Sequence, residues 1–306
     1  MMDVLKEVTT EPMVIVYTLY LYMARFTRQP FFETIICRNM GVSHNKTCES
    51  VDRNDPDFTQ IVNKTEDLLS YLQIFETVLP LVIVCIVGPL SDVYGRKWFM
   101  LINLVGCIFL PLGYLFINLL DNVPTWFLLL PSIPPALTGF DSVLFNTVYS
   151  YAGDASHGKS ARAASIRFII IDTLSNLVAP AGLYGGSYVL RVLGYGWLFG
   201  ISSGVALVSA LYIAFFVSNI IPEKSSEVVV IKEKNNSCGG TIIEFIRNLF
   251  SCVLERRAGY GRSVINLLLL ILGIHSITYT CDSNVSFIFS KKSLALIKLP
   301  FPTFSQ

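Results

Sequence analysis

Two apolar runs joined by a short polar turn decide the fold: Leu68–Val87 (LLSYLQIFETVLPLVIVCIV), Gly88–Lys97 (GPLSDVYGRK) and Trp98–Leu119 (WFMLINLVGCIFLPLGYLFINL). As an α-helix, an apolar run of about 20 residues spans the hydrocarbon core of a bilayer. Lipid offers no hydrogen-bond partner to the backbone, so such a run satisfies its own amides by forming a helix. Each run is therefore predicted to cross a membrane, and the turn is predicted to lie at the membrane surface.

The whole chain has the composition of a membrane protein. Of its 306 residues, 53% are hydrophobic and only 15% are charged, whereas a soluble domain carries about a quarter charged residues. Similar runs recur, and we predict seven spans: Pro12–Ile36, Leu68–Val87, Trp98–Leu119, Thr125–Tyr151, Ile166–Leu190, Trp197–Val217 and Val264–Phe289. The first is the weakest, because Arg25 and Arg28 interrupt it. A net charge of +1 argues against a nucleic-acid partner.

Loop charge predicts the orientation of the spans. The loop 218–263 carries seven basic and five acidic residues, and the turn after the second span ends in Arg96 and Lys97. The loop between the first two spans, Glu33–Leu69, has four basic and seven acidic residues. Because Lys and Arg collect on the cytoplasmic side, we expect a cytoplasmic N-terminus and an extracellular or lumenal loop at 37–67.

Two features of the loop 37–67 suit that placement. Asn45 and Asn63 each begin an N-glycosylation sequon, which is used only on the lumenal side. Cys37 and Cys48 flank the polar part of the loop, and a disulfide between them would form only in an oxidising compartment. The sequence therefore predicts a glycoprotein, with this pair as the disulfide candidate.

The turn between the second and third spans closely resembles the loop motif of the major facilitator superfamily, at the same position in the fold. The matching residues are Gly88, Leu90, Asp92, Gly95, Arg96 and Lys97. Gly88 would let helices approach closely and Gly95 would permit a tight turn, while Asp92 and Arg96 offer opposite charges. In that family the motif latches the inner gate, with its aspartate against a helix N-terminus of the other half. Without the family, the turn is a basic loop that sets topology.

More of the chain is similar to the proton-coupled folate transporter family (solute carrier family 46). Glu11 and Pro12 open the first span, and Tyr151–Asp154 closes the fourth before a basic loop that contains Arg162. The last features that carry the resemblance are Arg167, Asp172 and, in the seventh span, His275. The resemblance implies an all-α membrane protein with a six-helix bundle (1–217), a cytoplasmic loop (218–263) and the first helix of a second half (264–306). We expect an amphipathic helix within that loop, at Thr241–Arg257, and a chain truncated after the seventh span.

Asp172 is the first candidate for proton coupling. It lies inside the fifth predicted span and shares a helical face with small and polar residues, namely Asn176, Ala179 and Gly186. Such a stripe is typical of a helix that lines a water-filled cavity, where a carboxyl group can bind and release a proton. In the resembling family an acid at this place takes part in proton coupling. The alternative is an acid that pairs with Arg167 for packing.

Other polar residues inside the spans are further candidates, because a charge at the centre of a span costs about 2.5 to 3.5 kcal/mol. Glu76 is expected to face a cavity, and Asp141 is a weaker acidic candidate. Arg25 and Arg28 offer guanidinium groups to an anionic substrate; alternatively both reach the outer surface, which we prefer for Arg28. His275 is either a packing residue or, as the resemblance implies, an influence on proton coupling.

The sequence thus predicts a secondary transporter that moves an organic anion or folate-like metabolite with protons, by alternating access. The alternative is a truncated, non-transporting membrane subunit that associates with a full-length transporter or with itself. A seven-span receptor is less compatible with the predicted orientation and the loop motif, and a channel would differ by uptake that is passive and indifferent to pH. No phosphate-binding loop, nucleophile elbow or metal cluster indicates an enzyme, and no cofactor beyond the proton is expected. The protein is expected in the plasma membrane or an endolysosomal membrane. Its expected partners are membrane lipid and a small-molecule solute.

Overall fold

The computed structural model describes residues 10–40, 56–120, 123–156 and 161–219, together with Ser263, Asn266, Leu267, Leu270, Ile271 and Ile274. The chain divides into two compact units, residues 1–226 and 227–306. The long described segments belong to the first unit. The predictions for Asn45, Cys48, His275 and the amphipathic helix at 241–257 fall outside the described residues.

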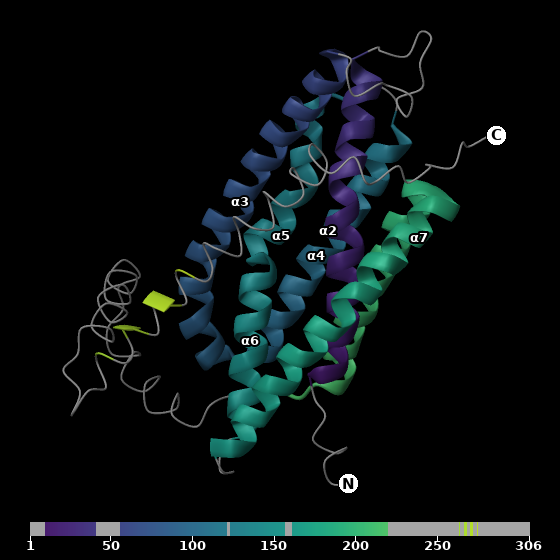
Figure 1. The fold of residues 1–306 in the computed structure, drawn as a ribbon. Coiled ribbons are helices and arrows are strands. Elements are labelled where there is room, and N and C mark those ends of the chain that lie inside the picture. Colours follow the sequence, from purple (N-terminus) through teal and green to yellow (C-terminus); the bar gives the residue numbers. More distant parts are fainter. Residues whose placement is uncertain are drawn as a thin grey trace. The chain divides into compact units, whose positions relative to one another are not determined.

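The described segments form a helical bundle, which confirms the predicted all-α fold (Figure 1). Its helices are α2 (Glu11–Asn39), α3 (Pro56–Tyr94), α4 (Arg96–Leu119), the 3-10 helix η2 (Thr125–Ser132), α5 (Ile133–Thr138), α6 (Phe140–Asp154) and α7 (Ala161–Phe216). The first three run up, down and up. The fourth predicted span is built from η2, α5 and α6 in succession, and α7 contains the fifth and sixth.

Within the described residues, four helices are long and apolar enough to cross a membrane: Thr59–Gly88, Arg96–Leu119, Thr125–Asp154 and Arg162–Phe216. The helix α2 is not among them. Even so, α2 is buried along its length in the bundle, with Val14, Tyr17, Phe31 and Ile35 at most 2% exposed. Two of the charges that make it less apolar, Arg25 and Arg28, form ion pairs with neighbouring helices.

Helix α7 reverses direction at Gly194, which has φ 82° and ψ −179°. Only glycine adopts such a backbone conformation without strain. The first arm begins beside α2, where Arg167 Nε lies 4.0 Å from Glu11 Oε1. The second arm returns to the same end of the bundle, where Lys97 Nζ donates to the Ala214 carbonyl at 2.8 Å. The two arms correspond to the predicted spans Ile166–Leu190 and Trp197–Val217.

Helical structure continues into the predicted loop 37–67 from both ends. Helix α2 continues to Asn39, and α3 already begins at Pro56. The reason is that α3 keeps a buried face well before the apolar run starts, through Ile61, Thr65 and Leu68. Its first part packs on the last turns of α2, where Ile36 and Cys37 contact Ile61. Tertiary packing thus extends the helix through polar sequence.

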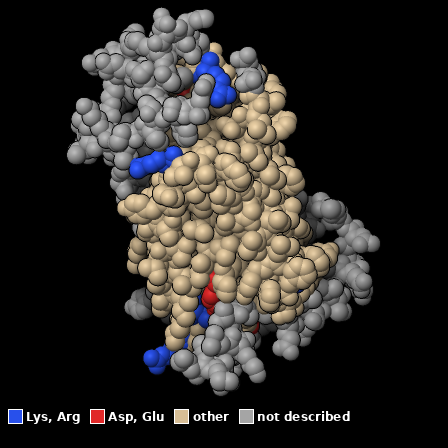
Figure 2. Space-filling model, turned by 90° about the vertical axis from the view of Figure 1, so that its right-hand side faces the viewer, with Lys and Arg blue, Asp and Glu red and all other residues tan. Residues whose placement is uncertain are grey.

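On one face of the bundle, charged side chains gather toward the two ends. Figure 2 shows a face whose middle is uncharged, with Lys, Arg, Asp and Glu above and below it. Large apolar side chains are exposed on the long helices, among them Ile102, Phe109, Phe116, Leu177 and Phe215. An uncharged belt between two charged ends is the surface that a bilayer-spanning bundle requires.

Two glycines of α7 allow its first arm to cross α2 closely. A Cβ atom at Gly182 would lie 2.9 Å from Tyr22 Cβ and 3.0 Å from the Leu19 carbonyl oxygen. A Cβ at Gly186 would lie 3.1 Å from the Cα of Met23. Small residues at such crossings let backbones touch, which is a main source of helix association in membranes. This agrees with the small residues of the fifth span, but Gly186 is then turned to α2 and away from the predicted cavity stripe.

Gly182→Ala is expected to lower the stability of the bundle by about 1 to 3 kcal/mol, because the added methyl group overpacks the crossing. Gly185→Ala is the matched control, since a Cβ at Gly185 meets nothing within 4 Å. The control should be neutral or more stable, because alanine favours a helix by up to about 1 kcal/mol over glycine. Thermal unfolding in detergent measures both. Equal melting temperatures would show that the crossing is not tight.

Candidate functional site

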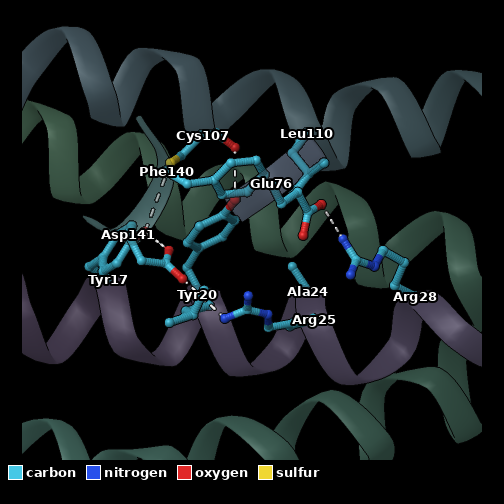
Figure 3. Close-up of a pocket in the computed structure, with 11 residues that line it drawn as sticks. Tyr17, Tyr20, Ala24, Arg25, Arg28, Glu76, Cys107, Leu110, Phe140 and Asp141 are labelled. Atoms are coloured by element: carbon cyan, nitrogen blue, oxygen red, sulfur yellow. Dashed lines mark hydrogen bonds and ion pairs between the residues drawn. The ribbon is translucent and has the colours of Figure 1, made fainter. Parts of the chain in front are cut away.

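A small cavity lies half-way along α2, where four helices meet (Figure 3). Its lining comes from α2, α3, α4 and α6: Tyr17, Tyr20, Leu21, Ala24, Arg25, Arg28, Glu76, Cys107, Leu110, Phe140 and Asp141. The volume is about 20 Å³, which is about the space that one or two water molecules need. The importance of the cavity lies in its lining, which contains two ion pairs at a depth where charges are rare.

The first ion pair joins α2 to α6. Arg25 Nη1 lies 3.1 Å from Asp141 Oδ2, and the hydroxyl of Tyr17 donates to Asp141 Oδ1 at 2.5 Å. Both carboxylate oxygens therefore have a donor. The Arg25 side chain is 53% exposed and that of Asp141 is 22% exposed. The described residues therefore cover this pair only in part.

The second ion pair joins α2 to α3 and is enclosed. Arg28 Nη1 bonds to Glu76 Oε1, and the two side chains are only 12% and 6% exposed. The Ser132 hydroxyl donates to the same carboxylate oxygen at 3.3 Å and lies 3.4 Å from the Tyr114 hydroxyl. The prediction that Arg28 reaches the outer surface is wrong. Its guanidinium bonds to Glu76 instead, because this buried carboxylate lies within reach and neutralises its charge.

The fourth span is interrupted beside the cavity. Helix α5 ends at Thr138, Gly139 has φ 94° and Phe140 has φ 46°. A positive φ at a non-glycine residue costs on the order of 1 to 3 kcal/mol and is typical of functional sites. Asp141 thereby lies in the first turn of α6, where the helix dipole favours a negative charge. The irregular backbone of the fourth span is thus centred on Gly139 and Phe140.

A second polar cluster occupies the end of the bundle that holds the Gly88–Lys97 turn. Arg96, 9% exposed, lies between two acids: Asp92 Oδ1 is 2.8 Å from its Nη2, and Asp154 Oδ2 bonds to its Nε. Gly95 makes the tight turn with φ 89°. The predicted Asp92–Arg96 contact is thus present, and Asp154 joins it from α6. The turn, the fourth span and α7 are therefore connected at this end.

Other motif residues are less engaged. A Cβ at Gly88 would meet no atom within 4 Å of the described structure, so the close helix approach expected there is not seen in this part of the chain. The side chain of Leu90 is exposed. Both positions lie on the outer face of α3, which the described helices leave largely uncovered.

The structure does not bring Asp172 to the cavity. Its residue is exposed on α7, and its backbone carbonyl accepts a hydrogen bond from the Asn176 amide at 2.9 Å. Arg167 faces Glu11, and Arg162 is exposed. The predicted stripe therefore divides: the part near Asp172 is open, whereas its last residue packs against α2 because α7 crosses that helix.

The end of the bundle opposite the Gly88–Lys97 turn contains the remaining predicted residues. Asn63 is exposed on α3, while Thr65 of the same sequon is buried and donates to the Ile61 carbonyl at 2.8 Å. Cys37 is disulfide-bonded, and its predicted partner, Cys48, is outside the described residues. Glycosylation and the Cys37–Cys48 pairing both stay predictions.

Sequence reasoning missed the hydroxyl groups of the site. Tyr17 holds Asp141, Tyr20 donates to the Cys107 carbonyl at 2.9 Å, and Ser132 holds Glu76. One signal was available for the tyrosines: Tyr17, Tyr20, Arg25 and Arg28 recur at helical spacing on one side of the first span. Nothing in the sequence indicates Ser132, because its contact depends on how the fourth span bends.

Glu76→Leu is expected to destabilise the bundle by about 3 to 5 kcal/mol, because it leaves the Arg28 guanidinium buried without its partner. The double variant Arg28→Met/Glu76→Leu should recover much of this loss, since it removes both charges and keeps the volume. Thermal unfolding in detergent compares the two. A double variant no more stable than the single one would contradict an enclosed ion pair.

Comparison with known proteins identifies the family. Residues 56–296 match the sequence model of the Major Facilitator Superfamily. The chain is 29% identical over 192 residues to the lysosomal proton-coupled steroid conjugate and bile acid symporter of Pongo abelii, covering 62% of this chain and 38% of that protein. The human protein of the same name is 29% identical over 183 residues, covering 59% and 37%.

A more distant relative is the human hippocampus abundant transcript 1 protein, 26% identical over 140 residues, or 45% of this chain and 26% of that one. The chain thus spans less than half the length of these curated relatives. The first two belong to solute carrier family 46, which this chain resembles in its motifs. Because the family match covers most of the sequence, the chain belongs to the major facilitator superfamily.

Proposed function

We propose that this chain supplies the first half of the substrate pathway of a proton-coupled secondary transporter for organic anions. One observation carries the proposal, namely the partly exposed pair of Arg25 and Asp141 half-way along the bundle. Proteins of this superfamily place their substrate site near the middle of the membrane, between two halves that rock against each other. The cavity beside α2 has that depth and offers an anion-binding group next to a proton acceptor.

The chemistry of the pair couples the two ligands. While Asp141 is ionised, its carboxylate holds Arg25. A proton on Asp141 removes that attraction and leaves the guanidinium to a substrate anion. Arginine suits this role, because its planar fork bonds two oxygens of a carboxylate or sulfate at once. Release of the anion lets the pair form again and expels the proton.

The enclosed pair has a different part in the proposal. Arg28 and Glu76 are shielded from the outside and held by Ser132. A buried pair of this kind is costly to separate, since disrupting it leaves a charge without a partner. It therefore fixes α3 against α2 while the neighbouring pair opens and closes. In a similar way, the Asp92–Arg96–Asp154 cluster would hold the Gly88–Lys97 turn against α6 at the cytoplasmic end.

Asp172 and His275 remain secondary candidates for proton movement. An ionised Asp172 exposed to lipid would cost about 2.5 to 3.5 kcal/mol, so its place on α7 calls for water or a partner helix. The apolar outer face of α3, with Ile74, Val78 and Leu81 exposed, likewise calls for lipid or further helices. Both features support a bundle that works together with a second half, whether in one protein or by association.

The substrate class follows from the relatives and from the site together. The most similar proteins reported above are named for steroid conjugates and bile acids, which combine a large apolar body with one anionic group. Arg25 is the more exposed of the two arginines that line the cavity, and one available guanidinium suits a molecule with one anionic group better than a polyanion. An endolysosomal membrane, with the N-terminus and the Gly88–Lys97 turn on the cytoplasmic side, completes the proposal.

Asp141→Asn is expected to flatten the dependence of uptake on external pH, because the amide cannot bind or release a proton. Uptake of a radiolabelled bile acid into proteoliposomes that contain the protein, across a series of pH values, measures this. Asp172→Asn is the comparison, since that acid is also intramembrane but lies away from the cavity. If Asp172→Asn flattens the profile and Asp141→Asn leaves it intact, coupling resides on α7 instead.

Arg25→Gln is expected to raise the KM for the bile acid by about 10- to 100-fold, the equivalent of a charge-assisted hydrogen bond worth about 1.5 to 3 kcal/mol. Arg25→Lys keeps the charge but loses the fork, so its KM should fall between the two. The same proteoliposome assay gives both values. Wild-type KM in Arg25→Gln would remove Arg25 from the binding site.

A further inference from the structure

A buried asparagine of α4 bonds to both sides of the break in the fourth span. Asn103 is fully buried, and its side-chain amide donates to the Thr138 carbonyl at 2.9 Å and to the Phe140 carbonyl at 2.8 Å. Its own oxygen accepts a weak bond from the Cys107 thiol at 3.7 Å. Both amide protons and the oxygen are therefore engaged, and their partners lie on either side of Gly139.

The break creates the need for such a donor. Thr138 is the last residue of α5, and the last carbonyls of a helix have no intrahelical partner. At the membrane surface, water would bond to them, but inside the bundle no water is guaranteed. Irregular backbone at membrane depth persists only where the surrounding protein satisfies it. Asn103 meets this requirement from the neighbouring helix.

Helix α4 is shaped to bring Asn103 to the break. One turn further along α4, a Cβ at Gly106 would lie 2.3 Å from Thr138 Oγ1. Any larger residue at Gly106 would push α4 away from α5 and lengthen the bonds of Asn103. The close approach of α4 to α5 at Gly106 and the hydrogen bonds of Asn103 therefore both involve Thr138.

We infer that Asn103 is a positioning residue that holds this break open and thereby aims Asp141 at Arg25. Asp141 follows Phe140 directly and lies in the first turn of α6. If the helix were continuous through Gly139 and Phe140, the Asp141 side chain would point in another direction. Its carboxylate would then lie out of reach of Tyr17 and Arg25. The inference rests on the Arg25–Asp141 pair of the proposed function but adds a residue that touches neither proton nor substrate.

The test removes the two donors and then observes the carboxylate itself. Asn103→Leu keeps a similar volume and donates no hydrogen bond. The infrared carboxylate band of Asp141, isolated by subtracting the spectrum of Asp141→Asn made in the same background, reports the Arg25 pairing. We expect this band to shift or vanish in Asn103→Leu while helical content by circular dichroism stays within error of the wild type. An unchanged band would overturn the inference.

Asn118→Leu is the matched control, because it makes the same change in the same helix near its other end, close to Gly196. It should leave the Asp141 band as in the wild type; a band altered equally by both leucine variants would show a general effect on α4 and overturn the inference. If Asn103→Leu does not fold, Asn103→Ser decides, because its hydroxyl retains one donor. A partial shift of the band supports positioning, and an unchanged band refutes it.

The infrared measurement requires no transport. A wild-type pH profile of uptake in Asp141→Asn would end the proposed coupling role while leaving the positioning result intact. Conversely, an unchanged Asp141 band in the Asn103 variants would end the positioning role and leave the coupling test untouched.

Discussion

The positive charges of α2 must be neutralised inside the bundle, and much of the arrangement depends on this constraint. Arg25 and Arg28 lie half-way along a helix whose other residues are largely buried, where an unpaired charge is costly. Their carboxylates come from different helices, Asp141 from α6 and Glu76 from α3. Helix α2 therefore becomes the central element to which the second and fourth spans are attached by charge. Apolar packing alone gives no such directional preference in lipid.

The two pairs are chemically similar but differ in their surroundings. Glu76 has a hydroxyl donor besides Arg28 and is closed off, whereas Asp141 and Arg25 keep a side open to the outside. The backbone of the fourth span is irregular just before Asp141, with its 3-10 segment and the positive φ angles at Gly139 and Phe140. A regular helix would have been more stable there. The break costs backbone energy, and it is located beside the half-exposed pair of Arg25 and Asp141.

The sequence predicted the fold well, because the length and hydrophobicity of each apolar run are enough to identify a membrane-spanning helix. Apolar runs of membrane thickness identified the helices, and the Gly88–Lys97 turn indicated the family from a local motif. Helix ends were less predictable: α3 starts well before its apolar run because it packs on α2, and that contact is invisible in one dimension. The predicted loop between the fifth and sixth spans is likewise shorter in the structure than in the prediction. Helical structure continues on both sides of it and is interrupted only at Gly194.

The site was predicted in its residue types but not in its pairings. Arg25, Glu76 and Asp141 were recognised as unusual because charges in apolar runs need a reason. Which acid meets which arginine depends on the register of helices far apart in sequence, and Asp172 therefore appeared a better candidate than Asp141. Asn103 shows the limit most clearly. Its value arises from a break in another helix, and a single polar residue in an apolar run does not reveal that.

The reversal at Gly194 has a mechanical consequence. With a single residue between them, the two arms of α7 have no slack at that end, so neither can slide along the other without straining the turn. The first arm is locked to α2 by backbone contact at Gly182 and Gly186, and the second is tied to α4 by Lys97. A displacement of any one of these helices is thus handed on to the other two. The hairpin therefore makes α2, α4 and α7 move as one rigid body rather than bend separately.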